Sequence, residues 1–140
     1  MYTIKGDPVP LARARHSQYK VYNTQKDLRI YQHIELERQV KRKPYDSMPL
    51  IMIVTFFMPI SKSLSKKRQE ELVGMPHFYK PDNSNLIKWI EDIGTALIYH
   101  DDCLIYKTIA QKIYDRNPRT EFILMTYAEE LEHGLQNLPK

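Results

Sequence analysis

The hydrophobic residues of this 140-residue chain follow two different periods. Residues 50–58 form an almost continuous apolar run, rich in Ile and Phe, between Pro49 and Pro59. A run of this length and composition predicts a strand that is buried on both faces. We expect further strands over residues 1–5, 20–22, 104–114 and 120–127. The last two would pair as a hairpin, because only a short polar loop separates them.

The helical period is clearest over residues 83–98. Apolar side chains recur there three or four positions apart and would share one face of a helix: Leu86, Trp89, Ile90, Ile93 and Leu97. The opposite face would carry Lys88, Glu91, Asp92 and Thr95. Asn83 or Ser84 can cap the start of this helix. The segment is the strongest indication of an amphipathic helix in the sequence.

Weaker patterns predict three more helices. Residues 25–42 carry apolar side chains at helical intervals, and Thr24 and Asp27 stand at the spacing of a capping box. The other two helices would cover residues 63–73 and 129–138. Together the elements predict one α+β domain over residues 1–140, with a mixed β-sheet flanked by α-helices.

The charge balance is basic but modest. The chain has 21 Lys and Arg against 17 Asp and Glu, which gives a formal net charge of +4. Such a surplus suits a polyanionic partner, and basic residues gather near residues 13–20, 41–43 and 62–68. Any single cluster of this kind is also explained as a solvated loop or helix end. Charge alone therefore leaves a nucleic-acid partner and an ordinary surface equally open.

Residue usage excludes several function classes. Cys103 is the one cysteine, so no intrachain disulfide can form and no zinc motif is present, and we expect Cys103 to be a small buried residue. The four glycines form no phosphate-binding loop, so we expect no nucleotide cofactor. The longest apolar stretch, residues 48–60, is too short to span a membrane, and no signal segment is visible. We expect a cytoplasmic protein with no membrane partner.

Acidic residues stand at both ends of the amphipathic segment. Asp82 precedes it, Asp101 and Asp102 follow it, and Lys88 lies on its polar face. Carboxylates that hold Mg²⁺ support phosphodiester hydrolysis, and a nearby lysine stabilises the developing negative charge. The two ends of such a helix lie roughly 20 Å apart, so Asp82 and Asp102 meet only if the chain turns back after Ile98. Taken alone, an Asp-Asp turn is most often a solvated loop.

One segment resembles a known family signature. Residues 80–88 read Lys-Pro-Asp-Asn-Ser-Asn-Leu-Ile-Lys, which resembles the Lys-Pro-Asp-x-Asp-Asn-Leu-x-Lys signature of the RusA Holliday-junction resolvases. Asp92 and the pair Asp101 and Asp102 are similar to later aspartates of that family. Residues 6–15, from Gly-Asp-Pro-Val-Pro to Arg-Ala-Arg, resemble its opening. The resemblance runs from about residue 4 to residue 125.

The resemblance implies an activity, a cofactor and partners. Such proteins are Mg²⁺-dependent endonucleases, with Mn²⁺ as a substitute, that cut four-way junctions and other branched DNA in recombination and repair. They act as homodimers, and a bacterial or phage origin is expected. The resemblance implies that Asp82, Lys88 and Asp102 are catalytic, with Asp82, Asp101 and Asp102 as metal ligands. It also implies DNA contacts, and the residues for these are Arg13, Arg15, Lys80 and Lys112.

Ser84 departs from the family pattern, which has an aspartate at this position. A hydroxyl is a weaker and neutral metal ligand, and three outcomes stay open. Ser84 binds the metal through water while Asp101 or Asp92 supplies the charge, or the enzyme uses one metal, or the chain binds junctions and cuts poorly. For Asp92 we favour an ion pair with Lys88, four residues earlier on the same helix face.

Two further interpretations concern binding. Tyr19, Tyr22 and Tyr79 lie in or near the basic and signature segments, where one of them could stack on an unpaired base at a branch point. We favour an ordinary position at the edge of the core for these residues. A protein-interaction domain without a nucleic-acid role is the third function hypothesis, beside the resolvase and the junction-binding module, and the signature segment argues against it.

Overall fold

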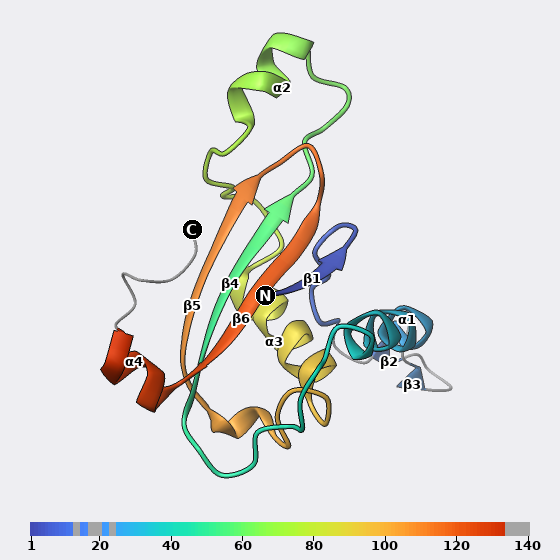
Figure 1. The fold of residues 1–140 in the computed structure, drawn as a ribbon. Coiled ribbons are helices and arrows are strands. Elements are labelled where there is room, and N and C mark those ends of the chain that lie inside the picture. The colour runs from blue at the N-terminus through green and yellow to red at the C-terminus, as the bar shows by residue number, and fades with distance from the viewer. Residues whose placement is uncertain (13–14, 17–20, 23–24, 134–140) are drawn as a thin grey trace.

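A mixed four-stranded sheet lies at the centre of the protein (Figure 1). The structure is a computed structural model and describes residues 1–12, 15–16, 21–22 and 25–133. The strands of the sheet, in spatial order, are β1 (Tyr2–Lys5), β6 (Arg119–Thr126), β4 (Leu50–Met58) and β5 (Ile105–Tyr114). A separate pair is formed by β2 (Arg15–His16) and β3 (Val21–Tyr22). The helices are α1 (Lys26–Glu37), α2 (Lys66–Leu72), α3 (Asn83–Gly94), a 3-10 turn η1 (Asp102–Leu104) and α4 (Tyr127–His133). The predicted α+β class and mixed sheet are confirmed.

Strand β4 occupies the middle of the sheet. It pairs in parallel with β5 along one edge and antiparallel with β6 along the other. Alternate residues of β4 face the main hydrophobic core: Leu50, Met52, Val54, Phe56 and Met58. The bounds predicted for this strand are confirmed, but the predicted hairpin of β5 with β6 is wrong, because β4 lies between them. An apolar strand gains most from a central position, where the backbone groups on both of its edges are hydrogen bonded.

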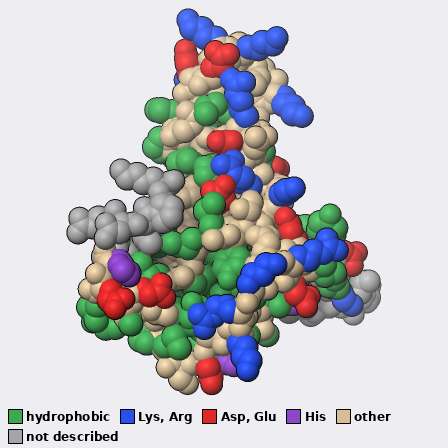
Figure 2. Space-filling model, in the orientation of Figure 1, with side chains coloured by type: hydrophobic (Ala, Val, Ile, Leu, Met, Phe, Trp, Pro, Cys, Tyr) green, Lys and Arg blue, Asp and Glu red, His purple; other side chains and the backbone are tan. Residues whose placement is uncertain are grey.

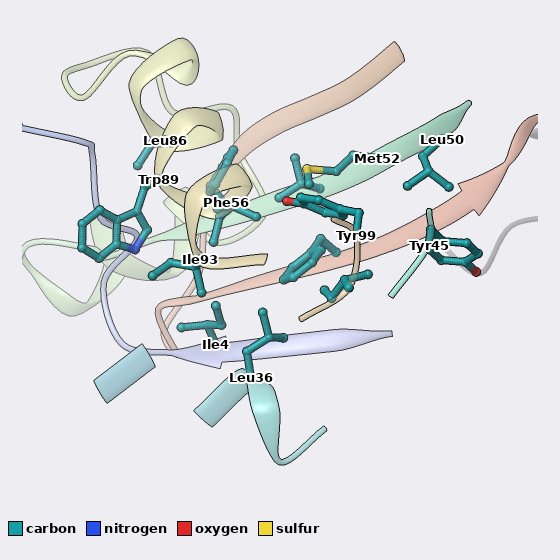
Figure 3. Packing of buried hydrophobic residues seen from close by; sticks show 14 of the residues in the cluster. Ile4, Leu36, Tyr45, Leu50, Met52, Phe56, Leu86, Trp89, Ile93 and Tyr99 are labelled. Carbon is teal, nitrogen blue, oxygen red and sulfur yellow. The ribbon is translucent and has the colours of Figure 1, made fainter. Parts of the chain in front are cut away.

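Helix α3 supplies the largest side chain of the core. Trp89 is fully buried, and Figure 3 shows it with Leu86 and Ile93 beside Phe56 of β4. Ile90 is buried as well, so the predicted apolar face is confirmed for the four of its residues that lie within the helix. The buried indole Nε1 of Trp89 donates a hydrogen bond to Oε1 of Gln32 at 2.7 Å, which ties α3 to α1.

The end of α3 is fixed by a tyrosine rather than by the apolar period. The helix stops at Gly94, four residues before the predicted end. Tyr99 is fully buried, and its hydroxyl donates to the backbone oxygen of Glu91 at 2.8 Å. Ala96 donates its N–H to the oxygen of Tyr99 and adopts a left-handed φ of 71°. The chain therefore doubles back beneath the last turn of α3.

Helix α1 is shorter than predicted and buries a different face. It ends at Glu37 instead of residue 42, and its first described neighbour is Gln25, since Thr24 of the expected capping box lies outside the described residues. Ile30 is 51% exposed, whereas Gln32 is buried. A buried indole needs a hydrogen-bond acceptor, so a glutamine takes the inward position that hydrophobicity alone would give to an isoleucine.

An arm of residues 59–79 projects beyond the end of the sheet and carries α2 (Figure 1). Ser65 caps α2 by accepting the N–H of Arg68, and Gly74, with a φ of 82°, follows its end. The helix predicted over residues 63–73 is confirmed in a shorter form. The arm returns along the edge of β5, where the N–H of His77 donates to the oxygen of Lys112 at 3.0 Å.

Helix α4 follows β6 directly and is held against β5. Glu130 accepts hydrogen bonds from Nζ of Lys107 and the hydroxyl of Tyr106, each at 2.7 Å. The predicted terminal helix is thus present up to His133, and its remaining residues lie outside the described part of the chain. None of the helices in the described ranges combines the length and the apolar content needed to cross a membrane.

The close approach of Gly94 to Tyr99 yields a stability prediction. A Cβ added at Gly94 would lie 2.6 Å from the hydroxyl oxygen of Tyr99. Gly94→Ala should therefore lower the free energy of unfolding by about 1–2 kcal/mol, because overpacking outweighs the better helix propensity of alanine. Urea denaturation of both proteins measures this difference.

The double variant provides the control for this prediction. Tyr99→Phe removes the hydroxyl, so the cost of Gly94→Ala should be smaller in that background than in the original chain. Equal costs in the two backgrounds would show that the hydroxyl is not what excludes a side chain at this position.

Candidate active site

The polar face of α3 organises the candidate site. Asp82 lies at its N-cap position, Ser84 and Lys88 follow on exposed turns, and Glu91 and Asp92 are half-buried near its end. This face is free for chemistry because the opposite face is buried in the core. Rigid placement on a packed helix fixes the order of the polar groups along one line.

Asp82 stands at the start of this line with an exposed partner. Its carboxylate accepts a hydrogen bond from Nζ of Lys80 at 3.1 Å and makes no capping bond to α3. Asn83 and Ser84, which the sequence offered as caps, are instead the first residues of the helix. Both charges of the Lys80–Asp82 pair are open to solvent, so the pair is weak and is available to other ligands.

Asp102 is brought to the far end of the line by the turn beneath α3. The carboxyl groups of Glu91 and Asp102 lie within hydrogen-bonding reach of each other. Asp101, beside them, accepts the N–H of Cys103 at 2.9 Å, which caps η1. The chain reversal after Ile98 that the sequence analysis required is therefore present. It brings Asp102 close to Glu91, and the positive charge of Lys88 acts on the carboxyl group of Asp102.

The pKa values of Glu91 and Asp102 are both raised above their ordinary values. Burial is the main cause that raises the pKa of Glu91, followed by the negative charge of Asp102. Burial also raises the pKa of Asp102 first, and the hydrogen bond and charge of Asp101 add to it, while Lys88 opposes the shift. The N–H of Cys103 lowers the pKa of Asp101. The negative charge of these carboxyl groups is therefore only partly offset by the positive charge of Lys88.

Asp92 does not have the partner expected for it. Its carboxylate pairs with Nη2 of Arg29 on α1 at 3.5 Å, so the favoured ion pair with Lys88 is wrong. Arg29 in turn lies over the ring of Trp89, at 5.5 Å from its centroid. Across the described ranges, no residue hydrogen bonds to the ammonium group of Lys88. Lys88 thus remains free to receive an anion between the two ends of the line.

The predicted metal-ligand set is divided between two places. Asp101 and Asp102 lie at the end of α3, whereas Asp82 lies nine residues before Glu91, or about 13 Å along the helix axis. Within the described residues, no three Asp, Glu, His or Cys side chains form a group that could hold a metal ion. Asp82 and Asp102 are therefore not joined into a single three-carboxylate site.

The predicted DNA contacts have different positions in the structure. Lys80 is exposed beside the start of α3. Lys112 instead uses its ammonium group to donate to the backbone oxygens of Tyr79 and Pro81, at 2.7 and 2.8 Å, so it fixes the loop before α3. Arg13 lies outside the described residues, and of Arg15 only the backbone is described.

Sequence reasoning missed one residue and misplaced another. Glu91 was assigned to the polar face of α3 without a role, although it stands three residues after Lys88, where a helix brings side chains together. That spacing could have identified it as a neighbour of the site. Cys103, expected to be buried, is exposed, because η1 lies on the surface.

Comparison with known proteins identifies the family of this chain. The sequence model of the family described as "Endodeoxyribonuclease RusA" matches residues 5–125. The chain belongs to the RusA endodeoxyribonuclease family. Resolution of Holliday junctions is the activity of the RusA family, and branched DNA is its substrate.

A curated bacterial protein is also similar to this RusA-family chain. It is "Uncharacterized protein YqaN" of Bacillus subtilis (strain 168), which is 27% identical over 132 residues, covering 88% of this chain and 93% of its own length. No solved structure matches the chain.

The burial of Glu91 beside the charge of Asp102 yields a prediction about pH. Because the folded state raises the pKa of Glu91, it binds that proton more tightly than the unfolded state does, and the resulting stability is lost as pH rises above the ordinary value of 4.5. In metal-free buffer, Glu91→Gln should therefore increase the free energy of unfolding at pH 7, by up to about 1 kcal/mol, and should bring no gain at pH 4.

The matched control is Glu37→Gln, at an exposed glutamate of α1. It should change the unfolding free energy equally little at both pH values. Urea denaturation at the two pH values measures all four differences, and a Glu91→Gln gain that does not depend on pH would contradict a raised pKa of Glu91 in the folded state.

Proposed function

We propose that this chain is a divalent-metal-dependent endodeoxyribonuclease that hydrolyses phosphodiester bonds at Holliday junctions and related branched DNA, in recombination and repair. The observation that carries the proposal is the free ammonium group of Lys88 beside the Glu91–Asp102 carboxyl pair, on one helix face of a RusA-family chain. Phosphodiester hydrolysis requires a cation that stabilises the developing negative charge and carboxylates that hold a metal ion.

The donor set fits Mg²⁺, or Mn²⁺ in its place. Two oxygen-donor carboxyl groups, Glu91 and Asp102, lie close together and lack a positive partner, and Mg²⁺ is commonly held by one or two carboxylates. When bound, such an ion lowers the pKa of a coordinated water and polarises a phosphoryl oxygen. We assign Glu91 and Asp102 as the ligands. Asp101 orients η1 and remains a predicted ligand, while Asp82 would need a second ion at the other end of α3.

The basic residues take the remaining parts of the proposed reaction. Lys88 stabilises the negative charge on the scissile phosphate, because no neighbouring group engages its ammonium within the described chain. Lys80 contacts the DNA backbone beside Asp82 and so holds the strand along α3. Arg13 and Arg15 are proposed as further backbone contacts, whereas the ammonium of Lys112 acts mainly on the loop before α3.

The proposed assembly is a homodimer with one site for each strand to be cut. We assign the open face of the sheet to the dimer contact, where apolar side chains of three strands lie side by side, including Ile53, Ile109 and Ile123. Ionic groups on this face are paired within the chain, as Arg119 is with Glu121, so a second copy meets little repulsion. The arm, by contrast, is basic and would repel its own copy.

A second function is favoured by Ser84. The family aspartate at this position is replaced by a neutral hydroxyl, and the carboxylate of Asp82, two residues earlier, is already paired with Lys80. On this alternative the chain grips branched DNA through the same surface and cuts it poorly.

Cleavage of a labelled four-way junction tests the main proposal. In Mg²⁺ or Mn²⁺ we expect paired nicks in two opposing strands near the branch point, and none in EDTA or in a duplex. Asp102→Asn should lower the cleavage rate by about 100-fold or more while junction binding is retained. Asp27→Asn, at an exposed aspartate of α1, is the control and should cut at the original rate. Retained cleavage in Asp102→Asn would remove the assigned site.

The Ser84 question has its own test. If the hydroxyl limits metal capture, Ser84→Asp should raise Mg²⁺ affinity, measured by calorimetry, and should raise the cleavage rate about 10-fold, since it adds a charged oxygen ligand. Asn117→Asp, at an exposed residue of the loop between β5 and β6, also adds one negative charge and should do neither. No gain from Ser84→Asp would leave the binding-only alternative without support.

A further inference from the structure

Two aromatic side chains lie in solvent immediately before the signature segment. Phe78 and Tyr79 are 77% and 62% exposed, and their rings are stacked, with centroids 4.5 Å apart and planes 27° from parallel. Tyr79 therefore does not lie at the edge of the core, which was the favoured interpretation for it. Contiguous apolar surface that is rimmed by polar residues is a feature of binding sites.

The aromatic pair is held in place by its surroundings. Lys112 donates to the backbone oxygens of Tyr79 and Pro81, and the N–H of His77 donates to the oxygen of Lys112. The ring of His77 also lies edge-on to Tyr79, with centroids 6.1 Å apart. Both ends of the aromatic pair are thus tied to β5, so a flat ligand that stacks on it meets a surface that is already ordered.

A cavity of about 410 Å³ opens within the arm, between this pair and α2. Its apolar walls come from Leu64 and Leu72, while Arg68 and His77 contribute polar groups. The Nδ1 atom of His77 is buried and has no hydrogen-bond partner in the described part of the chain. A cavity of this size with aromatic walls and few polar groups suits a small planar ligand that carries hydrogen-bonding edges, which is the chemistry of a nucleobase.

The charge around the cavity suits the phosphates of a nucleic acid. Lys62, Lys66 and Lys67 are exposed lysines in and before α2, and Figure 2 shows Lys and Arg side chains over this helix. Lys80 is exposed as well and follows Tyr79 directly in the chain. The acidic residues of α2 are neutralised, since Glu70 pairs with Arg116 and Glu71 with Arg68. Both segments that line the cavity thus carry basic residues.

The cavity is also close to the start of α3, where the candidate active site begins at Asp82. Tyr79 precedes Asp82 by three residues, which span at most about 11 Å. A base held there would therefore place its DNA strand at the start of α3. The helix leads from there to Lys88, and Asp102 lies near its other end.

We propose that the cavity between α2 and the Phe78–Tyr79 pair binds one unpaired nucleobase at the branch point of the DNA and so selects branched over fully paired substrates. This inference rests on the proposed function and deepens it by assigning the group that recognises the branch. Arg68 and His77 meet the edge of the base, the aromatic pair meets its face, and Lys80 meets the adjoining phosphate.

Binding measured in EDTA, where cleavage is not expected, tests the inference. The probes are a four-way junction with one unpaired thymidine at the branch, the same junction with an abasic nucleotide there, and a duplex. The double variant Phe78→Ala, Tyr79→Ala should bind the thymidine junction about 10-fold more weakly and the duplex unchanged. The abasic nucleotide should weaken the original protein by the same factor and should weaken the variant no further.

Tyr31→Ala is the control, since Tyr31 is 72% exposed on α1, away from the arm. It should change none of the affinities, and Phe78→Trp should retain the thymidine preference because it keeps a stacking face. An original protein that ignores the abasic substitution, or a double variant that loses the same factor on all three probes, would overturn the inference. Failure of the original protein to bind any junction would instead remove the proposed function.

Discussion

Burial of the apolar face of α3 against β4 determines where the polar groups of the site lie. Trp89 and its apolar neighbours on that face are fully or almost fully buried, which leaves the helix one orientation on the sheet. Lys88 and Glu91 are then directed outward because they stand on the other side of a regular helix. Burying four large side chains contributes on the order of 6–12 kcal/mol, far more than any contact among the polar groups. The core therefore sets the geometry of the site, and the site adapts to it.

Tyr99 completes the arrangement that α3 begins. Its buried hydroxyl donates to the oxygen of Glu91, and Gly94 leaves the space that its ring occupies. The chain is thereby reversed, and Asp102 arrives beside Glu91. The same reversal carries β5 back along β4, where Lys112 reaches the loop before α3 and fixes the aromatic pair. One core tyrosine and one strand lysine thus connect the carboxyl cluster at one end of α3 to the proposed base cavity at the other.

Elements with a strong local signal could be predicted from the sequence, and those set by tertiary contacts could not. The apolar run of β4 and the amphipathic face of α3 carry their burial in their own period, so both were predicted well. The end of α3 depends on Tyr99, and the buried position of Gln32 depends on the indole of Trp89. The position of β4 between β5 and β6 depends on pairing across the sheet. Gln32 and Trp89 are far apart in sequence, and Tyr99, although near in sequence, acts through its burial in the core rather than through the period of α3.

The candidate site divides in the same way. Its residues could be recognised from the signature segment, but their grouping in space could not. Asp82 and Asp102 belong to the same family pattern, yet the length of α3 separates them in the structure. Glu91 entered the site only when the turn at Tyr99 placed Asp102 beside it. An acidic residue on a helix face is ordinarily solvated, and only its three-dimensional neighbours distinguish a ligand from a surface charge.

The position of the divalent ion tests this account most directly. Crystals grown with Mn²⁺ would show the ion by its anomalous scattering, independently of any cleavage. The account predicts an anomalous peak between the carboxyl groups of Glu91 and Asp102, and loss of that peak in Asp102→Asn. A peak beside Asp82 and Ser84, with none at Asp102, would contradict it and would move the chemistry to the start of α3.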